Sequence, residues 1–137
     1  MPSSAATRST RQKRAIREAL EAAERPLSVE EVLVAAERRA AGLGVATVYR
    51  AIKALLADGF LVSVEMPGEP SRYEVAGKTH HHHFRCLACQ RIFEIPGCVE
   101  EIKVTLPTGF RAVEHDLTFH GICAACGAKR SAEERAG

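Results

Sequence analysis

The sequence predicts an α+β protein built in two parts, and three observations lead to this prediction. Apolar residues recur at helical spacing in three stretches between residues 10 and 58, and two β-like runs follow within residues 60–75. All 5 cysteines and all 6 histidines lie between His80 and Cys126, so the two parts differ in chemistry. A chain of 137 residues has room for one domain or for two small ones.

Composition excludes several classes of protein. Hydrophobic residues make up 46% and charged residues 26% of the chain, which is ordinary for a globular protein. No apolar run reaches the roughly 18–20 residues that span a bilayer, so we expect no membrane partner. The basic N-terminus lacks the apolar segment of a secretory signal, and we therefore expect a cytoplasmic protein. Paired cysteines in that compartment bind metal more often than they form disulfides.

Helical periodicity predicts three helices in the first part, over residues 10–24, 28–41 and 45–58. Residues 1–9 are small, polar and basic, and we expect them to form a flexible arm. Thr10 is the expected N-cap of the first helix. Ser28 and Glu31 have the spacing of a capping box at the start of the second helix.

Two short strands joined by a turn complete the first part. Residues 60–65 and 71–75 have β-like composition, and the Pro and Gly residues within 67–70 predict the turn. Three helices followed by a hairpin are the order of the winged helix-turn-helix, and no other common fold uses this order within about 65 residues. We therefore predict a winged-helix DNA-binding domain over residues 1–76 and a polar hinge over residues 77–79.

The second part, residues 80–137, has weaker local patterns. Short β-like runs lie at residues 84–86, 91–95, 110–114 and 117–122, and a weak helix is predicted near residues 99–106. The charged tail over residues 129–137 is expected to fray. These patterns favour a small α/β domain.

Two CxxC pairs lie within this second part. Each pair lets two thiolates bind one metal ion through a tight turn, and two pairs supply the four thiolates of a closed structural zinc site. The alternative is two surface thiol pairs or redox motifs. Cys98 stands alone after Pro96 and Gly97, and we expect it to be a small buried hydrophobe rather than a ligand. The sequence therefore predicts a structural zinc bound by Cys86, Cys89, Cys123 and Cys126.

Four consecutive histidines, His80 to His83, precede the first CxxC pair. Alternate side chains of a strand point to opposite faces, so one tract can supply two ligands to each of two sites. Mixed sites of imidazole and carboxylate suit zinc, iron or manganese rather than calcium. The alternatives are a solvated histidine tract and, for Glu74, an ordinary charge at a strand edge. The two predicted sites are Glu74 with His81 and His83, and His80 with His82, Glu101 and His115.

Six motifs occur in order along residues 8–126: Ser9–Arg14, Pro26–Ser28, Ala46–Arg50, Ser71–Glu74, His80–Cys89 and Gly121–Cys126. Together they resemble the ferric uptake regulator (Fur) family of metal-dependent bacterial repressors. The resemblance implies a homodimer with an N-terminal winged helix and a C-terminal α/β dimerisation domain over residues 80–137. It also implies a structural zinc on the four paired cysteines, no enzyme activity, and binding of double-stranded DNA at a palindromic operator.

The third predicted helix is expected to enter the major groove of DNA. Its polar side carries Thr47, Tyr49, Arg50 and Lys53. Arg50 suits guanine or phosphate, and Tyr49 can pack against thymine methyl groups, although a core position for Tyr49 is the alternative. Arg8 matches the position at which relatives carry a basic residue that reaches the minor groove.

The resemblance also implies the roles of the two mixed sites. A sensory site in the family uses the matches of Glu74, His81 and His83 together with a histidine of the DNA-binding domain. No histidine precedes His80 here, so the fourth ligand is absent, or is Glu65, a neighbouring acid or water. The match to the family's second site is complete, with Glu101 preferred to Glu100.

The expected function is a metal-sensing repressor that binds its operator as a metal-loaded dimer and controls metal-uptake or metal-homeostasis genes. The unbroken histidine tract and the missing DNA-domain histidine resemble zinc-responsive members, so we favour zinc over iron, with manganese last. A peroxide sensor is less favoured, since that branch carries Asp where Glu74 and Glu101 stand. The sequence contains no HExxH-type helix, which argues against a zinc-dependent hydrolase. A zinc-stapled interaction module is the remaining alternative.

Overall fold

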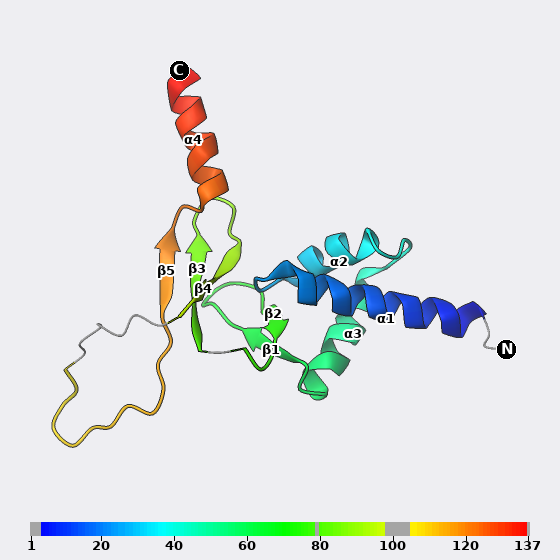
Figure 1. Ribbon diagram of the computed structural model, residues 1–137, viewed down its shortest axis with the longest axis horizontal. Helices are drawn as coiled ribbons and strands as arrows, with labels where there is room; N and C mark the ends of the chain where they lie inside the picture. The colour runs from blue at the N-terminus through cyan, green and yellow to red at the C-terminus, as the bar shows by residue number, and fades with distance from the viewer. Residues whose placement is uncertain (1–3, 79, 98–104, 137) are drawn as a thin grey trace. The chain divides into compact units, whose positions relative to one another are not determined.

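The computed structural model describes residues 4–78, 80–97 and 105–136 and divides the chain into two compact units, Met1–Lys78 and Thr79–Gly137 (Figure 1). The first unit contains α1 (Ser4–Ala23), α2 (Val29–Glu37), α3 (Val45–Ala57), β1 (Leu61–Val64) and β2 (Arg72–Val75). The second unit contains β3 (His81–Cys86), β4 (Ile92–Pro96), β5 (Thr118–Gly121) and α4 (Ala124–Ala136). None of the described helices has both the length and the apolar character needed to cross a membrane.

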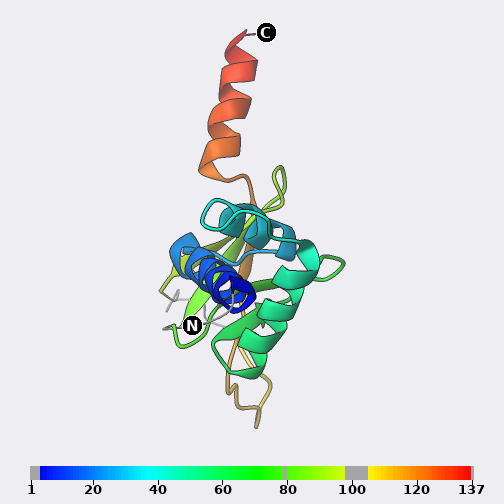
Figure 2. The ribbon, with the colours of Figure 1, turned by 90° about the vertical axis from the view of Figure 1, so that its right-hand side faces the viewer.

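Three helices enclose the hydrophobic core of the first unit. Ile16 of α1, Val32 of α2, and Val48 and Ile52 of α3 are each at most 2% exposed and belong to one cluster. Figure 2 is viewed nearly along the axis of α1 and shows α2 and α3 packed around this helix. The buried residues recur at helical spacing, so each helix turns one apolar face inward.

The wing of the first unit is a hairpin tied to the helices by the backbone. β1 and β2 pair antiparallel, with Leu61 opposite Val75. Leu27, in the loop before α2, exchanges two backbone hydrogen bonds of 2.9 and 2.8 Å with Tyr73 of β2. The predicted capping box of Ser28 and Glu31 is present at the start of α2. The end of the loop between α1 and α2 is therefore held in place by the N-cap of α2 and by its backbone hydrogen bonds to the wing.

The second unit is built on a three-stranded sheet of order β4-β3-β5 (Figure 1). β3 and β4 pair antiparallel, whereas β3 and β5 pair parallel. A parallel pair needs a long connection, and here the chain passes through β4 and the segment that follows it, up to residue 117, before it enters β5. Figures 1 and 2 both show α4 leading away from the end of β5 rather than lying on the sheet. The central strand β3 therefore has a neighbour on each edge.

This architecture confirms the predicted fold class, an α+β chain with a winged helix-turn-helix followed by a small α/β unit that contains the four paired cysteines. The order of the predicted helices and of the hairpin in the first unit is also confirmed. The predicted domain limits, with a hinge at residues 77–79, stay a prediction.

Three local predictions are wrong. The first helix begins at Ser4, so Thr10 is not its N-cap and Arg8 lies inside a helix, because residues 4–9 contain no Pro or Gly to end it. The tail is helical rather than frayed, since Ala, Glu, Lys and Arg over residues 124–136 favour a helix. Residues 110–114 form no strand; their side chains are exposed, so nothing buries them against a neighbour. The predicted helix near 99–106 and Cys98 fall wholly or largely outside the described residues.

Candidate functional site

The four paired cysteines come together from distant parts of the second unit. Cys86 ends β3, Cys89 lies in the following turn, and Cys123 and Cys126 lie just before and within the first turn of α4. The four sulfur atoms all lie within 4.8 Å of one another. Parallel pairing of β3 with β5 sets Cys86 opposite Gly121, two residues before Cys123, and thereby joins the two pairs.

Backbone donors polarise this cysteine cluster. The amide N–H groups of Cys89 and Cys123 donate to Cys86 Sγ at 3.5 and 3.4 Å. These bonds, with that of Cys89 the stronger influence, lower the pKa of Cys86 to about 6 despite its complete burial. The neighbouring thiols, Cys123 first, raise the pKa of Cys126 to about 12. All four cysteines are free of disulfides, and four sulfur donors at this spacing suit tetrahedral zinc.

A second cluster consists of His82 of β3, His80 directly before that strand, and His115 in the segment before β5. Ring nitrogens of His80, His82 and His115 lie within 4.8 Å of one another, and the Nε2 atoms of His80 and His115 are 3.3 Å apart. Burial, followed by the charges of His80 and His115, lowers the pKa of His82. A neutral imidazole is the form that binds metal, so this environment suits a ligand. Glu101, the predicted fourth member, lies outside the described residues.

The remaining histidines of β3 lie together as well. The rings of His81 and His83 have centroids 4.9 Å apart. Strand alternation thus sorts the tract into two pairs, His80 with His82 and His81 with His83. His120, on β5, is exposed and belongs to neither group of potential ligands.

Glu94 is a candidate ligand that the sequence reasoning missed. It lies on β4 directly opposite His83, and its Oε1 is 3.8 Å from His81 Nδ1. The side chains of His81 and Glu94 are 14% and 20% exposed, so both are largely shielded from water. The antiparallel register of β3 with β4 was the missing information, because the CxxC turn between the strands places residue 94 beside residue 83.

The two acids considered in the first unit have different surroundings. Glu74 lies on β2 opposite Val62 and is 4% exposed. Glu65, considered as a replacement fourth ligand, follows β1 and is exposed. Its carboxylate accepts hydrogen bonds from the hydroxyls of Ser63 and Ser71, and these bonds lower its pKa, that of Ser63 most. The ligand roles of both residues stay predictions.

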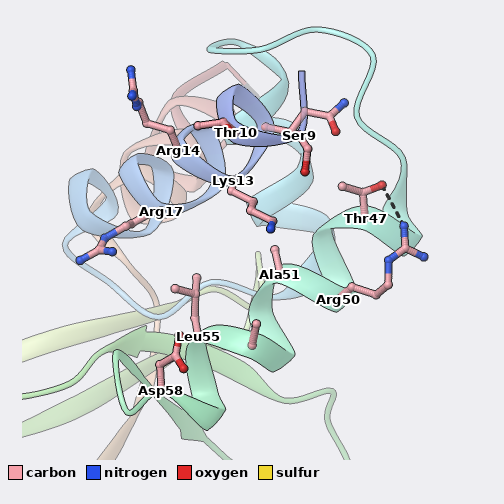
Figure 3. A pocket seen from close by; sticks show the side chains of 12 residues that line it. Ser9, Thr10, Lys13, Arg14, Arg17, Thr47, Arg50, Ala51, Leu55 and Asp58 are labelled. Atoms are coloured by element: carbon pink, nitrogen blue, oxygen red, sulfur yellow. Dashed lines mark hydrogen bonds between the residues drawn. The ribbon is translucent and has the colours of Figure 1, made fainter. Parts of the chain in front are cut away.

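The predicted DNA-contacting residues of α3 lie on its outer side. Tyr49 is 55% exposed, so it does not take the alternative core position. Arg50 and Lys53 are exposed, and Thr47 is half-buried. Arg50 Nη2 donates to Thr47 Oγ1 at 3.4 Å, as Figure 3 shows. Arg8 is also exposed, but α1 carries it instead of a flexible arm.

Known proteins are similar to this chain along most of its length. The chain matches the Ferric uptake regulator family over residues 4–120. It is 32% identical over 122 residues to the Ferric uptake regulation protein of Bacillus subtilis (strain 168), a match that covers 85% of this chain and 82% of that protein.

Two solved structures extend the comparison. The ferric uptake regulator Fur of Helicobacter pylori, described with three functional metal binding sites, has a TM-score of 0.60 and 25% identity, covering 85% of this chain and 79% of that chain. FurB from M. tuberculosis, a zinc uptake regulator, has a TM-score of 0.52 and 32% identity, covering 90% and 99%. A family of transcription regulators is consistent with the expectation that the chain is not an enzyme. The resemblance seen in the sequence is confirmed, and the chain belongs to the ferric uptake regulator family of metal-dependent transcription regulators.

Proposed function

We propose that this protein is a zinc-responsive repressor that acts in the cytoplasm and binds a palindromic operator as a metal-loaded homodimer. Its targets are metal-uptake or metal-homeostasis genes. The observation that carries the proposal is the sorting of one histidine tract into two separate donor groups beside a four-cysteine cluster. The four cysteines already suffice for a structural metal, so the histidine groups are available for a regulatory one.

The four cysteines are proposed to hold a structural zinc. Sulfur-only donor sets with no open position are typical of structural zinc, which stabilises the folded chain outright. The complete burial of Cys86 and its two backbone donors support this role, because both favour a permanently bound metal over a reactive thiol.

Glu74, His81 and His83 are proposed as sensory ligands, with Glu94 as the fourth. Glu94 lies beside both histidines, and this position supports the assignment. It replaces the fourth ligand that a histidine of the DNA-binding domain would supply, because the chain has no histidine before residue 80. The second site, with His80, His82, Glu101 and His115, is proposed as an additional metal site. One ring nitrogen from each of His80, His82 and His115 already lies within 4.8 Å of the other two.

Ligands drawn from both units explain how metal controls DNA binding. Glu74 precedes the hinge at residues 77–79, whereas the two histidines follow it. Shared ligation therefore restrains the hinge and sets the separation of the two recognition helices of a dimer to the spacing of the operator half-sites. Moving a two-state population from 1:99 to 99:1 requires about 5.5 kcal/mol of differential binding, which two sensory sites per dimer share.

Zinc is favoured over iron, and manganese comes last, on the chemistry of the donors. Imidazole nitrogen suits zinc and iron, whereas manganese prefers oxygen ligands. Zinc also accepts four ligands, the number available when Glu94 joins Glu74, His81 and His83. The similarity to the zinc uptake regulator of M. tuberculosis supports the same choice.

The decisive experiment measures binding of the protein to DNA from upstream of its own gene, by fluorescence anisotropy. Chelator is present, or Zn²⁺, Mn²⁺ or, under anaerobic conditions, Fe²⁺ is added. We expect Zn²⁺ to strengthen binding at least about a hundredfold, which corresponds to about 2.7 kcal/mol of coupling. The variant H81A/H83A loses this response and keeps its fold, because only ligands are removed.

His120→Ala is the matched control, since it removes an exposed histidine of the same sheet that belongs to neither donor group. Equal DNA binding with and without chelator would contradict the proposal. A response to Fe²⁺ alone would replace zinc by iron, and a full response in H81A/H83A would move sensing to the His80 and His82 site.

A further inference from the structure

The turn between α2 and α3 is held by one side chain of α2. Glu37, the last residue of α2, accepts hydrogen bonds from the backbone N–H groups of Gly42 and Leu43. Both bonds are 2.9 Å long, and each carboxylate oxygen accepts one of them. Hydrogen bonds from backbone N–H groups to a charged carboxylate are stronger than those to a neutral acceptor. The Glu37 side chain therefore ties the end of α2 to the residues that lead into α3.

The two residues bound by Glu37 give the turn a defined conformation. Gly42 has a φ of +85°, which glycine adopts without the strain that a side chain would cause. Leu43 is half-buried and packs against the hydrophobic cluster of the first unit. The turn is thus fixed from two sides, because Glu37 holds its backbone and the core holds the Leu43 side chain.

The first turn of α3 depends on these preceding residues for its position. Gly44 is the N-cap of α3 and supplies no side-chain hydrogen bond to the helix. Val45 and Ala46, the first two residues of α3, are exposed, and Val48 is its first buried residue. Core packing therefore fixes the body of α3, whereas the turn held by Glu37 fixes the direction of its N-terminal end.

We infer that Glu37 is a positioning residue for DNA recognition, which orients the N-terminal end of α3 in the major groove. The inference rests on the proposed DNA-binding function and adds a residue that acts through α3. Residues near the N-terminus of a recognition helix contact the base edges. Thr47, Tyr49 and Arg50 lie in the first two turns of α3, so their reach depends on this orientation.

Loss of Glu37 should affect sequence discrimination more than general attraction to DNA. Contacts to base edges carry the sequence information, whereas contacts to phosphates do not. Phosphate contacts can be made by flexible cationic side chains, but a base contact requires the helix to present its side chain at hydrogen-bond distance. The ratio of the affinities for specific and unrelated DNA therefore reports on the role of Glu37.

The test compares zinc-loaded wild type with E37A on DNA from upstream of its own gene and on an unrelated duplex of equal length. We expect E37A to bind the upstream DNA about tenfold more weakly, the scale of one lost base contact, and the unrelated duplex within about twofold of wild type. Glu37→Gln keeps one of the two oxygen acceptors and should lose about threefold, half of that free energy. Amide hydrogen exchange by NMR should become faster at Gly42 and Leu43 in E37A.

Glu30→Ala is the matched control, because it removes an exposed carboxylate from the same helix at the end remote from the turn. An equal loss of discrimination in E30A would assign the effect to charge and overturn the inference. Equal losses of E37A on both duplexes, unchanged discrimination, or unchanged exchange at Gly42 and Leu43 would also overturn it and leave the proposed function intact. A zinc-loaded wild type that binds both duplexes equally would overturn the proposed function together with the inference.

Discussion

Gly121 shows how one residue without a side chain holds the metal-binding sheet together. It ends β5 and lies opposite Cys86 on the parallel neighbour β3. A Cβ atom added at Gly121 would lie 3.0 Å from Cζ of the Phe84 ring, tighter than most Cβ contacts in folded proteins, so the ring would have to shift. The ring of Phe84 therefore fits against the backbone at the point where the two cysteine pairs meet.

Gly121→Ala is expected to destabilise the zinc-loaded protein by about 1–3 kcal/mol, because the added methyl group displaces the Phe84 ring. Chemical denaturation at fixed zinc concentration measures the change. Gly127→Ala is the control: its added Cβ meets Ile122 at an ordinary 3.9 Å, within α4, where Ala is the better helix former by about 0.8–1.0 kcal/mol. An equal loss of stability in both variants would show that the Phe84 contact is not the cause.

The start of α2 combines a capping box with an ion pair. Ser28 Oγ accepts from Glu31 N, and Glu31 Oε1 accepts from Ser28 N, both at 3.2 Å. Arg25 Nη2 lies 2.7 Å from Glu31 Oε2, with the two side chains 20% and 25% exposed. Burial alone would raise the pKa of Glu31, but the bonds from Arg25 and Ser28 outweigh burial and lower it.

This ion pair predicts a pH dependence at the level of the element. A carboxyl group whose pKa is lowered in the folded state stabilises the protein above its unfolded pKa, about 4.5, and this stabilisation is lost as the pH falls below that value. Glu31→Gln keeps the capping hydrogen bond and removes the charge. We expect it to cost about 0.5–1 kcal/mol at pH 7 and almost nothing near pH 3.

Urea denaturation followed by helical circular dichroism at several pH values measures this difference. Glu30→Gln, which removes an exposed charge from the same first turn of α2, controls for the general effect of a charge near the helix N-terminus. A cost for E31Q that stayed constant from pH 7 to pH 3 would rule out the ion pair as its source.

At the scale of the whole molecule, the two units differ in what stabilises them. The first unit has a cluster of ten buried hydrophobic residues contributed by its helices, its wing and Leu27 of the loop between α1 and α2. Among the described residues of the second unit, the buried hydrophobic ones are Cys86 and Ile92 alone. A unit with so small a core of its own depends on further support, such as a metal or a partner subunit.

Removal of metal is therefore expected to affect the two units unequally. Chelation, or the substitution Cys86→Ser, should abolish protection of the amides of β3, β4 and β5, since binding of structural zinc is coupled to folding. The helices α1 to α3 should keep their protection, because none of their buried core residues is a metal ligand. Hydrogen exchange followed by mass spectrometry distinguishes the units.

His120→Ala provides the control, because His120 is an exposed residue of β5 outside the groups of potential metal ligands, so the variant should behave as the wild type. Full protection of the sheet in C86S or in chelator would exclude zinc as its support. Simultaneous loss of protection in both units would show that they unfold together.

Much of the site could be predicted because its signals are local. The CxxC spacings and the alternation of the histidine tract depend on turn and strand geometry, which short segments carry by themselves. Glu94 escaped prediction because its place beside His81 depends on pairing between β3 and β4.

The sequence by itself determined the family, the order of elements in the first unit, the four cysteines and the two histidine pairs. These features follow from periodicity, spacing and residue type, which need no contact between distant segments. The tertiary structure alone decided that Tyr49 is exposed, that the two cysteine pairs meet beside Gly121, and that Glu94 lies next to His81. Each depends on packing or strand register between segments far apart in the chain, and local propensity does not specify these contacts.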